Sequence, residues 1–212
     1  MKPEIDYTLY VCTDRKLMSS PSVEASVEAA VRGGATVIQL REKDVTGREF
    51  YETALAVKRV TDCYGVPLII NDRIDIAIAV DAAGVHLGQK DIPVEVARKL
   101  LGEEKIIGIS AANPREARLA AEKGADYLGV GAMYQTSTKT DTRPVTLETL
   151  AEIRSAVKIP IVVIGGIGRE NAMNFKGLGV NGIAVVSSVV AQRDVTAAAE
   201  EMKRIFLTGA TD

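Results

Sequence analysis

The sequence predicts a single-domain α/β protein, a (β/α)8 TIM barrel that spans residues 1–212. Short β-branched runs alternate with longer amphipathic stretches along the whole chain, as expected for parallel strands joined by helical crossovers. Eight such runs occur, and eight strands close a barrel of this class. Their apolar residues are continuous, as in Ile161-Val162-Val163-Ile164. Such continuity is typical of strands that are covered on both faces.

The strands are expected at residues 7–11, 36–40, 67–70, 84–87, 106–109, 127–130, 160–164 and 182–186. Between them, apolar residues repeat at helical spacing and form one buried stripe per helix, as in Phe50, Ala54 and Val57 and again in Val94, Ala97 and Leu101. The run Asn113-Pro114-Arg115-Glu116 combines a capping side chain, a first-turn proline and a glutamate that can reach back, which indicates a helix start. An open doubly wound sheet is the competing topology, but no switch point is evident.

Composition and charge indicate an ordinary globular protein. Hydrophobic residues make up 47% and charged residues 25%, and 26 Lys and Arg against 28 Asp and Glu leave a net charge of -2. This balance gives no sign of binding to nucleic acid or to an anionic membrane. The first six residues lack an apolar signal core and the apolar runs are too short to span a bilayer, so a cytoplasmic location is expected. Cys12 and Cys63 have no paired spacing, which favours reduced thiols over a disulfide or a metal site.

The second predicted strand leads directly into the charged segment Gln39-Leu40-Arg41-Glu42-Lys43-Asp44. On an extended chain alternate residues share a face, so Gln39, Arg41 and Lys43 would project together where the strand meets solvent. Two cations and an amide suit a polyanion such as a pyrophosphate. The alternative is a solvated loop whose patch is neutralised by Glu42 and Asp44.

Polar side chains also follow the other strands, at the face where barrels of this class bind ligands. Asn71-Asp72 follows the third strand and Asp91 follows the fourth. Each could cap a helix. Two carboxylates at adjacent strand ends could instead bind a hard cation such as Mg²⁺. His86 is the only histidine, so a soft-metal site is not expected, and its apolar strand predicts a packed, hydrogen-bonded side chain.

Glycines follow the seventh strand, at Gly165, Gly166 and Gly168. Their backbone N–H groups could bind a phosphate, together with the positive end of a helix expected after Gly168 and the hydroxyls of Ser187 and Ser188. The alternative is a tight turn that needs glycine for its backbone angles.

Taken together, these motifs resemble those of thiamine-phosphate synthases in order and spacing, over nearly the whole chain. The matching segments are Gln39 to Asp44, Ile70-Asn71-Asp72, Gly84-Val85-His86-Leu87-Gly88-Gln89-Lys90-Asp91, Gly108-Ile109-Ser110, Thr136-Ser137-Thr138-Lys139 and Ile164-Gly165-Gly166-Ile167. The resemblance implies a (β/α)8 transferase that joins an aminopyrimidine carrying a pyrophosphate to a thiazole carrying a phosphate. Pyrophosphate would leave first and a pyrimidine methyl cation would form, which the thiazole nitrogen then captures.

The resemblance also implies roles for individual residues. The pyrimidine pyrophosphate would be held by Gln39, Arg41, Lys43, Asn71, Ser110 and Lys139, and catalysis would depend on Arg41, Lys43, Ser110 and Lys139. The cofactor Mg²⁺ would be held by Asp72 and Asp91, and the thiazole phosphate by Thr136, Thr138, Gly166, Val186 and Ser187. The expected partners are these two small phosphorylated molecules. A homo-oligomer is compatible with the sequence. Ala132 and Gln135 stand where members of the resembled family usually carry proline in one or both places.

Two rival functions remain at this point. A thiazole tautomerase shares the fold, but that branch carries a histidine two residues after the strand-five serine, where this chain has Ala112. A catalytically silent ligand-binding barrel is the other rival, and the intact set of charged groups argues against it.

Overall fold

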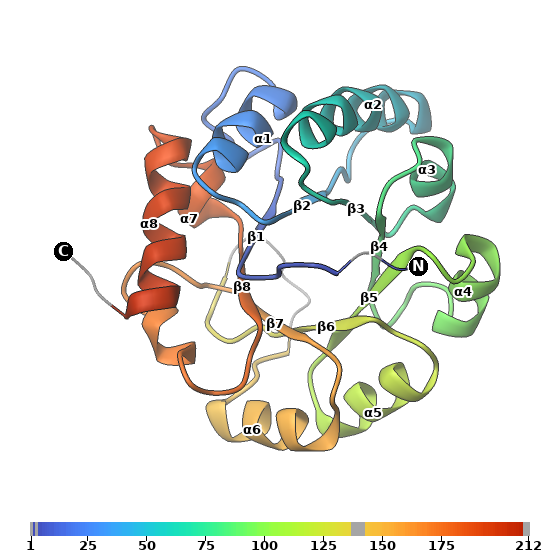
Figure 1. The fold of residues 1–212 in the computed structure, drawn as a ribbon, viewed down its shortest axis with the longest axis vertical. Coiled ribbons are helices and arrows are strands. Elements are labelled where there is room, and N and C mark those ends of the chain that lie inside the picture. Colours follow the sequence, from blue (N-terminus) through green and yellow to red (C-terminus); the bar gives the residue numbers. More distant parts are fainter. Residues whose placement is uncertain (1, 3, 137–142, 210–212) are drawn as a thin grey trace.

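The structure is a computed structural model that describes residues 2, 4–136 and 143–209, and its centre is a closed barrel of parallel strands (Figure 1). Strands β1 to β8 follow one another around the barrel in chain order, and β8 pairs with β1. Their bounds are Leu9–Cys12, Val37–Leu40, Leu68–Asn71, Gly84–Leu87, Ile106–Ala111, Tyr127–Val130, Ile161–Ile164 and Gly182–Val185. The predicted fold class is therefore confirmed, and each of the eight expected strands is present.

Helices surround the barrel on its outside (Figure 1). They are α1 Val23–Arg32, α2 Gly47–Tyr64, α3 Ile74–Ala79, α4 Val94–Leu101, α5 Pro114–Glu122, α6 Leu147–Ala156, the 3-10 helix η1 Ala172–Phe175, α7 Ser187–Val190 and α8 Val195–Thr208. The predicted start of α5 is confirmed, because the Asn113 side chain accepts the backbone N–H of Glu116 at 3.0 Å. The Glu116 carboxylate in turn accepts from the N–H of Ala112, one residue before the cap. The apolar stripe of α2 is buried as expected, at Phe50, Ala54 and Val57.

Alternation along the strands divides the apolar residues into two cores. One set points outward and packs under the helices, and it includes Leu9, Ile38 and Leu128. The other set points into the barrel and fills it: Tyr7, Tyr10, Val37, Ile69, Ile106, Tyr127, Val162 and Ala184. Because successive residues of a strand point to opposite faces, Gln39, Arg41 and Ser110 share the inward face with the second set. The barrel therefore directs their side chains toward its axis.

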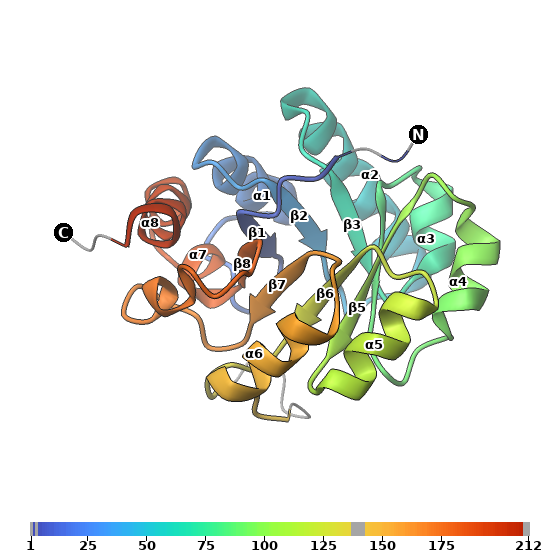
Figure 2. The same cartoon turned by 60° about the horizontal axis from the view of Figure 1, so that its bottom comes forward.

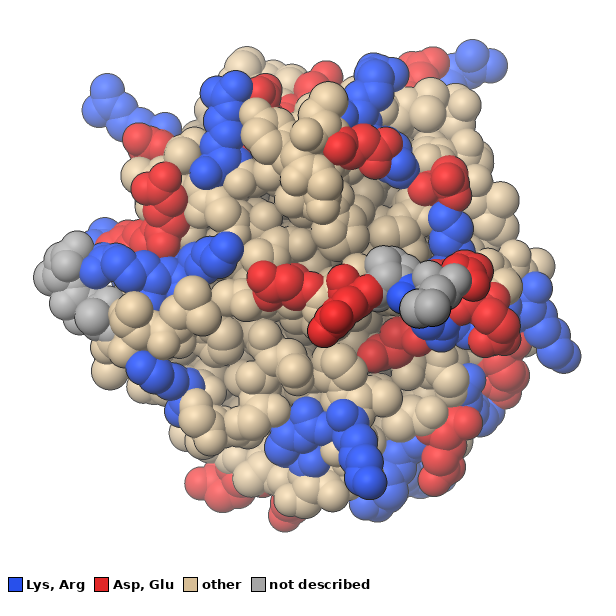
Figure 3. All heavy atoms as spheres, in the orientation of Figure 1, with Lys and Arg blue, Asp and Glu red and all other residues tan. Residues whose placement is uncertain are grey.

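The two ends of the barrel differ. The N-terminal segment crosses one opening, at the end opposite to the arrowheads of the strands (Figure 2). Positive and negative side chains are interspersed over the face that carries this segment (Figure 3). The strand arrowheads point to the other end, where the predicted site residues lie. Within the described residues, none of the helices has the length and apolar character needed to traverse a bilayer.

Candidate active site

The predicted site residues meet at the carboxyl ends of the strands. Gln39 and Ser110 lie in β2 and β5, and Asn71 ends β3. The others lie in the segments that follow strand ends, with Ser187 as the first residue of α7: Arg41, Lys43, Asp72, Asp91, Thr136, Gly166, Val186 and Ser187. Thr138 and Lys139 lie outside the described residues. Eight loops of a closed barrel converge at this end, which brings residues far apart in the sequence to one face.

The charged segment after β2 pairs with the loop after β1 through three ion pairs. Arg41 Nη1 lies 2.9 Å from Asp14 Oδ2, and Arg15 Nε lies 3.0 Å from Glu42 Oε2. Lys16 pairs with Asp44. Glu42 and Asp44 therefore form their ion pairs with Arg15 and Lys16 rather than with Arg41 and Lys43. Asp14 and Arg15 were not expected as partners. They follow the first strand, and residues that follow any strand of the barrel lie at this same end.

The Arg15–Glu42 pair differs from its neighbours because Glu42 is buried, with its residue only 8% exposed. Arg15 makes two hydrogen bonds to this carboxylate, at 3.0 and 3.1 Å. Removal of one partner leaves a buried charge without its hydrogen bonds, which is costly. This ion pair therefore anchors the loop that positions Arg41.

We expect Arg15→Ala to lower the free energy of unfolding by about 2 kcal/mol, the cost of losing hydrogen bonds to a buried charged group. Lys16→Ala is the matched control, because Lys16 and Asp44 are both well exposed. It should leave the free energy of unfolding nearly unchanged. Urea denaturation of both variants measures the difference. Equal losses would show that the Arg15–Glu42 pair does not anchor the loop.

Two carboxylates lie together beside Lys43. Lys43 pairs with Asp72, and Asp91 Oδ2 accepts the backbone N–H of Gly88 at 2.6 Å. Burial raises the pKa of Asp91, and the neighbouring charge of Asp72 raises that pKa further. Asp72 has a φ of 63°, a left-handed conformation that residues other than glycine seldom adopt and that is often found at functional sites.

Neither carboxylate caps a helix. The N-cap residue of α3 is Arg73 and that of α4 is Pro93, and neither helix has a side-chain cap hydrogen bond. The capping alternative for Asp72 and Asp91 is therefore wrong. Two carboxylates whose charges repel each other suit a hard cation. Proteins often bind Mg²⁺ through one or two carboxylates, and substrate oxygens and water complete its coordination. In the described part of the chain no group of three or more His, Cys, Asp or Glu side chains forms a metal-binding cluster.

His86 has the packed, hydrogen-bonded environment that its strand predicts. Its Nδ1 lies 2.9 Å from the hydroxyl of Tyr127, and its Nε2 lies 3.0 Å from Oγ of Ser110. Gln39 is buried in the same barrel interior, where its Nε2 donates to the hydroxyl of Tyr10 at 2.9 Å. The sequence did not single out Tyr10 and Tyr127. An inward-facing strand residue has the same sequence pattern whether it packs in the core or supports a site.

The glycines after β7 form a tight turn. Gly165 and Gly166 have φ values of 102° and 64°. A methyl group on Gly166 would lie 2.6 Å from the backbone oxygen of Gln135 in the loop after β6. Asn171 closes the turn, because it accepts the N–H of Gly168 at 2.9 Å and donates to the carbonyl of Gly166 at 3.0 Å. The turn alternative therefore describes this segment.

The helix expected after Gly168 is present only as a short 3-10 helix, which does not begin at the glycine turn. The segment continues as a turn and then as the 3-10 helix η1, which starts at Ala172. The N–H of Gly168 is already donated to Asn171, so this group does not take part in an anion site. The N–H of Gly166 remains a candidate, because Asn171 contacts Gly166 through the carbonyl oxygen of that residue.

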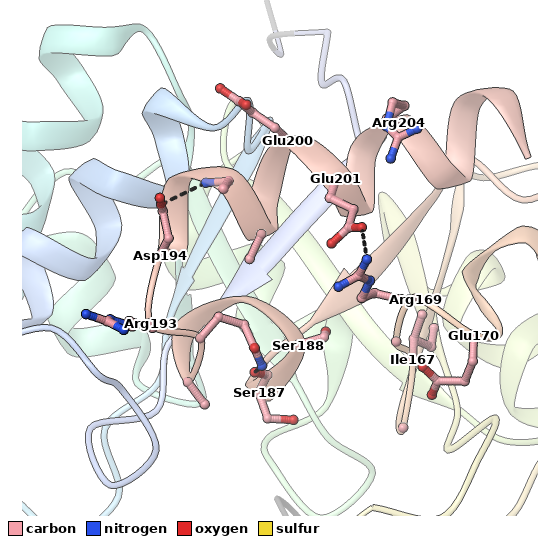
Figure 4. A pocket seen from close by; sticks show the side chains of 16 residues that line it. Ile167, Arg169, Glu170, Ser187, Ser188, Arg193, Asp194, Glu200, Glu201 and Arg204 are labelled. Carbon is pink, nitrogen blue, oxygen red and sulfur yellow. Dashed lines mark hydrogen bonds and ion pairs between the residues drawn. The ribbon is translucent and has the colours of Figure 1, made fainter. Parts of the chain in front are cut away.

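A cavity of about 910 Å³ opens between this turn, α7 and α8 (Figure 4). Gly166 and Ser187 both line it, and so does Ser188, whose buried Oγ has no hydrogen-bond partner among the described residues. Arg169 and Glu201 form an ion pair at 2.6 Å on its wall. Two of the residues predicted for the thiazole phosphate therefore share one cavity. Val186 and Thr136 are not among its lining residues.

The chain was compared with known proteins. A family model described as thiamine monophosphate synthase matches residues 9–189. A thiamine-phosphate synthase of Clostridium beijerinckii is 54% identical over 207 residues, which cover 98% of this chain and 99% of that protein. One from Ruminiclostridium cellulolyticum is 53% identical over 210 residues, with 99% and 100% covered. The solved structure of a thiamine phosphate pyrophosphorylase from Pyrococcus furiosus superposes with a TM-score of 0.88 at 44% identity, with 95% and 96% covered.

Proposed function

The chain belongs to the thiamine-phosphate synthase family, and from this premise we propose which of its residues perform the transfer and on which groups. The substrates are an aminopyrimidine that carries a pyrophosphate and a thiazole that carries a phosphate. Arg41 and Lys43 bind the pyrophosphate, which is the leaving group. Gln39, Asn71 and Ser110 hold the rest of the pyrimidine substrate.

The observation that carries this proposal is the arrangement of two cations at the end of β2, each held by a carboxylate from a neighbouring loop. Arg41 is fixed by Asp14 and Lys43 by Asp72. A guanidinium has five N–H groups and an ammonium has three, so each cation keeps donors after this contact. Both side chains are therefore held in place and still able to bind phosphate oxygens.

Cations that are already in place favour loss of pyrophosphate. Negative charge develops on the bridging and terminal oxygens as the C–O bond breaks, and donors aimed there in advance stabilise the transition state. Lys139, outside the described residues, is proposed to add a third cation. The pyrimidine methyl cation is then captured by the thiazole nitrogen. Because both substrates are bound side by side, no nucleophile from the protein is required.

Asp72 and Asp91 are proposed to hold Mg²⁺, and the repulsion between these two carboxylates supports this assignment. When bound, the ion supplies positive charge to the phosphate oxygens. Lys43 contacts Asp72, so the Lys43 ammonium group lies next to the proposed Mg²⁺ position. The thiazole phosphate is proposed to bind near Gly166, Val186 and Ser187, with Thr136 and Thr138 from the loop after β6; the shared cavity of Gly166 and Ser187 supports this placement.

We expect the purified protein to release pyrophosphate only when both substrates and Mg²⁺ are present. Each of the three components is omitted in turn, and pyrophosphate is measured with a coupled phosphate assay. Thiazole isomerisation in the absence of the pyrimidine would instead identify a tautomerase. No turnover by a folded protein with all three components would identify a silent binding barrel.

A further inference from the structure

Beneath the proposed pyrimidine site, four hydrogen bonds in series cross the inside of the barrel. Gln39 Nε2 donates to the Tyr10 hydroxyl at 2.9 Å, and this hydroxyl lies 2.7 Å from the hydroxyl of Tyr127. Tyr127 lies 2.9 Å from His86 Nδ1, and His86 Nε2 lies 3.0 Å from Ser110 Oγ. The two ends of this series, Gln39 and Ser110, are both residues proposed to hold the pyrimidine substrate.

The barrel leaves room for this series through glycines on its inner face. A methyl group on Gly108 would lie 2.1 Å from Cζ of Tyr127, and one on Gly129 would lie 2.8 Å from Cε1 of His86. Tyr10 and Tyr127 are almost fully buried, at 2% and 0% exposure. Buried polar groups need partners, so the rings and the glycines opposite them form one packed unit.

The proton order along the series follows from the donor inventory. Burial raises the pKa of Tyr10 and of Tyr127 well above the usual value for a phenol, so each keeps its one proton. The Gln39 amide nitrogen can only donate, which leaves Tyr10 to donate to Tyr127. Tyr127 then donates to His86 Nδ1. A neutral imidazole that accepts at Nδ1 carries its proton on Nε2 and donates it to Ser110 Oγ.

We propose that Tyr10, Tyr127 and His86 are positioning residues that fix which hydrogen-bonding group Gln39 and Ser110 present to the pyrimidine substrate. Because the Gln39 nitrogen is engaged with Tyr10, its amide oxygen remains to accept from the substrate. Because Ser110 Oγ accepts from His86, its own proton remains to be donated. The series therefore presents an acceptor at one end and a donor at the other.

This polarity matches the substrate of the proposed function, on which the inference rests. The exocyclic amino group of an aminopyrimidine donates hydrogen bonds, and its ring nitrogens only accept them. The reverse order would point the Gln39 N–H groups at an amino group and the Ser110 lone pairs at a ring nitrogen. A pyrimidine with an oxo group in place of the amino group would face the Gln39 oxygen with another acceptor, and we expect the site to reject it at least about 100-fold.

The tautomer of His86 is the direct test, because this is the only histidine in the chain. ¹⁵N NMR of the untagged, unliganded protein should show a protonated Nε2 and an unprotonated Nδ1. Tyr127→Phe removes the donor to Nδ1 and should shift the tautomer population. Tyr10→Phe leaves that donor in place and should keep the tautomer. Tyr7→Phe is the matched control, because the Tyr7 ring packs 4.9 Å from that of Tyr127 and its hydroxyl is not part of the series.

Steady-state kinetics separates positioning from folding. Tyr127→Phe and Tyr10→Phe should each raise KM for the pyrimidine about tenfold, the effect of roughly one hydrogen bond, and leave KM for the thiazole unchanged. Tyr7→Phe should change neither value. A wild-type His86 protonated on Nδ1, or a Tyr127→Phe variant that matches Tyr7→Phe in both measurements, would overturn the inference. The NMR measurement needs no substrate, so a failed transfer assay would count against the proposed function and not against the proton order.

Discussion

Arg41→Ala is expected to lower kcat by about 100- to 1000-fold, the range seen when one donor to a developing negative charge is removed. The loss should fall on kcat more than on KM for the pyrimidine, because the charge on the leaving group is greatest in the transition state. Arg41→Lys keeps the charge and loses the planar fork, so it should restore part of the activity. Initial rates of pyrophosphate release over a range of pyrimidine concentrations measure both effects.

Asp14→Asn is the matched control for Arg41→Ala, because it removes the charge that holds Arg41 and keeps Arg41 itself. We expect a much smaller loss of kcat. Far-UV circular dichroism and urea denaturation should show that the Arg41→Ala protein is folded. If Arg41→Ala unfolded the protein, Arg41 would be a structural partner of Asp14 rather than a leaving-group cation. An equal loss of activity in a folded Asp14→Asn protein would contradict the smaller role assigned to Asp14 and show that its contact with Arg41 is required for the transfer.

Asp91→Asn is expected to lower turnover at least about 100-fold and to abolish stabilisation by Mg²⁺. A metal ion contributes several kcal/mol of charge stabilisation to a phosphoryl leaving group, and about 1.4 kcal/mol corresponds to tenfold in rate. Without metal, the variant should be at least as stable as the wild type, because the substitution removes a charge that is disfavoured first by burial and then by the nearby Asp72, the two causes that raise the pKa of Asp91. Thermal melts with and without Mg²⁺ test this, since a ligand that binds only the folded state raises Tm.

Asp44→Asn provides the control for Asp91→Asn. It also removes one carboxylate at the same end of the barrel, but Asp44 is exposed and pairs with Lys16. We expect normal turnover and a normal increase of Tm with Mg²⁺. If Asp91→Asn kept the Mg²⁺-dependent increase of Tm, the ion would bind elsewhere and the Asp72 and Asp91 assignment would be wrong.

The sequence predicted the barrel and the face of its site well, for physical reasons. Continuous apolar runs report burial on both faces, and polar residues that follow such runs must lie where the strands end. This placed Gln39, Arg41, Asp72 and Ser110 at one end of the barrel without knowledge of their neighbours.

The side-chain partners could not be predicted in the same way. Arg41 pairs with Asp14, 27 residues earlier, and adjacent residues of the same segment pair with different loop residues. The chain alone left open the alternative that Glu42 and Asp44 neutralise Arg41 and Lys43, because it shows which charges alternate and not which loops meet. Tyr10 and Tyr127 are 117 residues apart, and only closure of the barrel brings their hydroxyls together.

The segment after β7 shows a second limit. Its glycines are compatible with a tight turn and also with a phosphate site completed by the positive end of a following helix. Local sequence does not separate these alternatives. In the structure the Asn171 side chain bonds to Gly168 and to Gly166 across the turn, and the short 3-10 helix η1 follows. The glycine pattern alone does not reveal these side-chain contacts.

The most direct test of the central claim is a crystal structure of the protein with Mg²⁺ and pyrophosphate. The claim predicts density for pyrophosphate in contact with Arg41 and Lys43, and density for a metal ion between Asp72, Asp91 and the phosphate oxygens. Pyrophosphate bound only in the cavity beside Gly166 and Ser187, with Arg41 and Lys43 free of it, would contradict the claim.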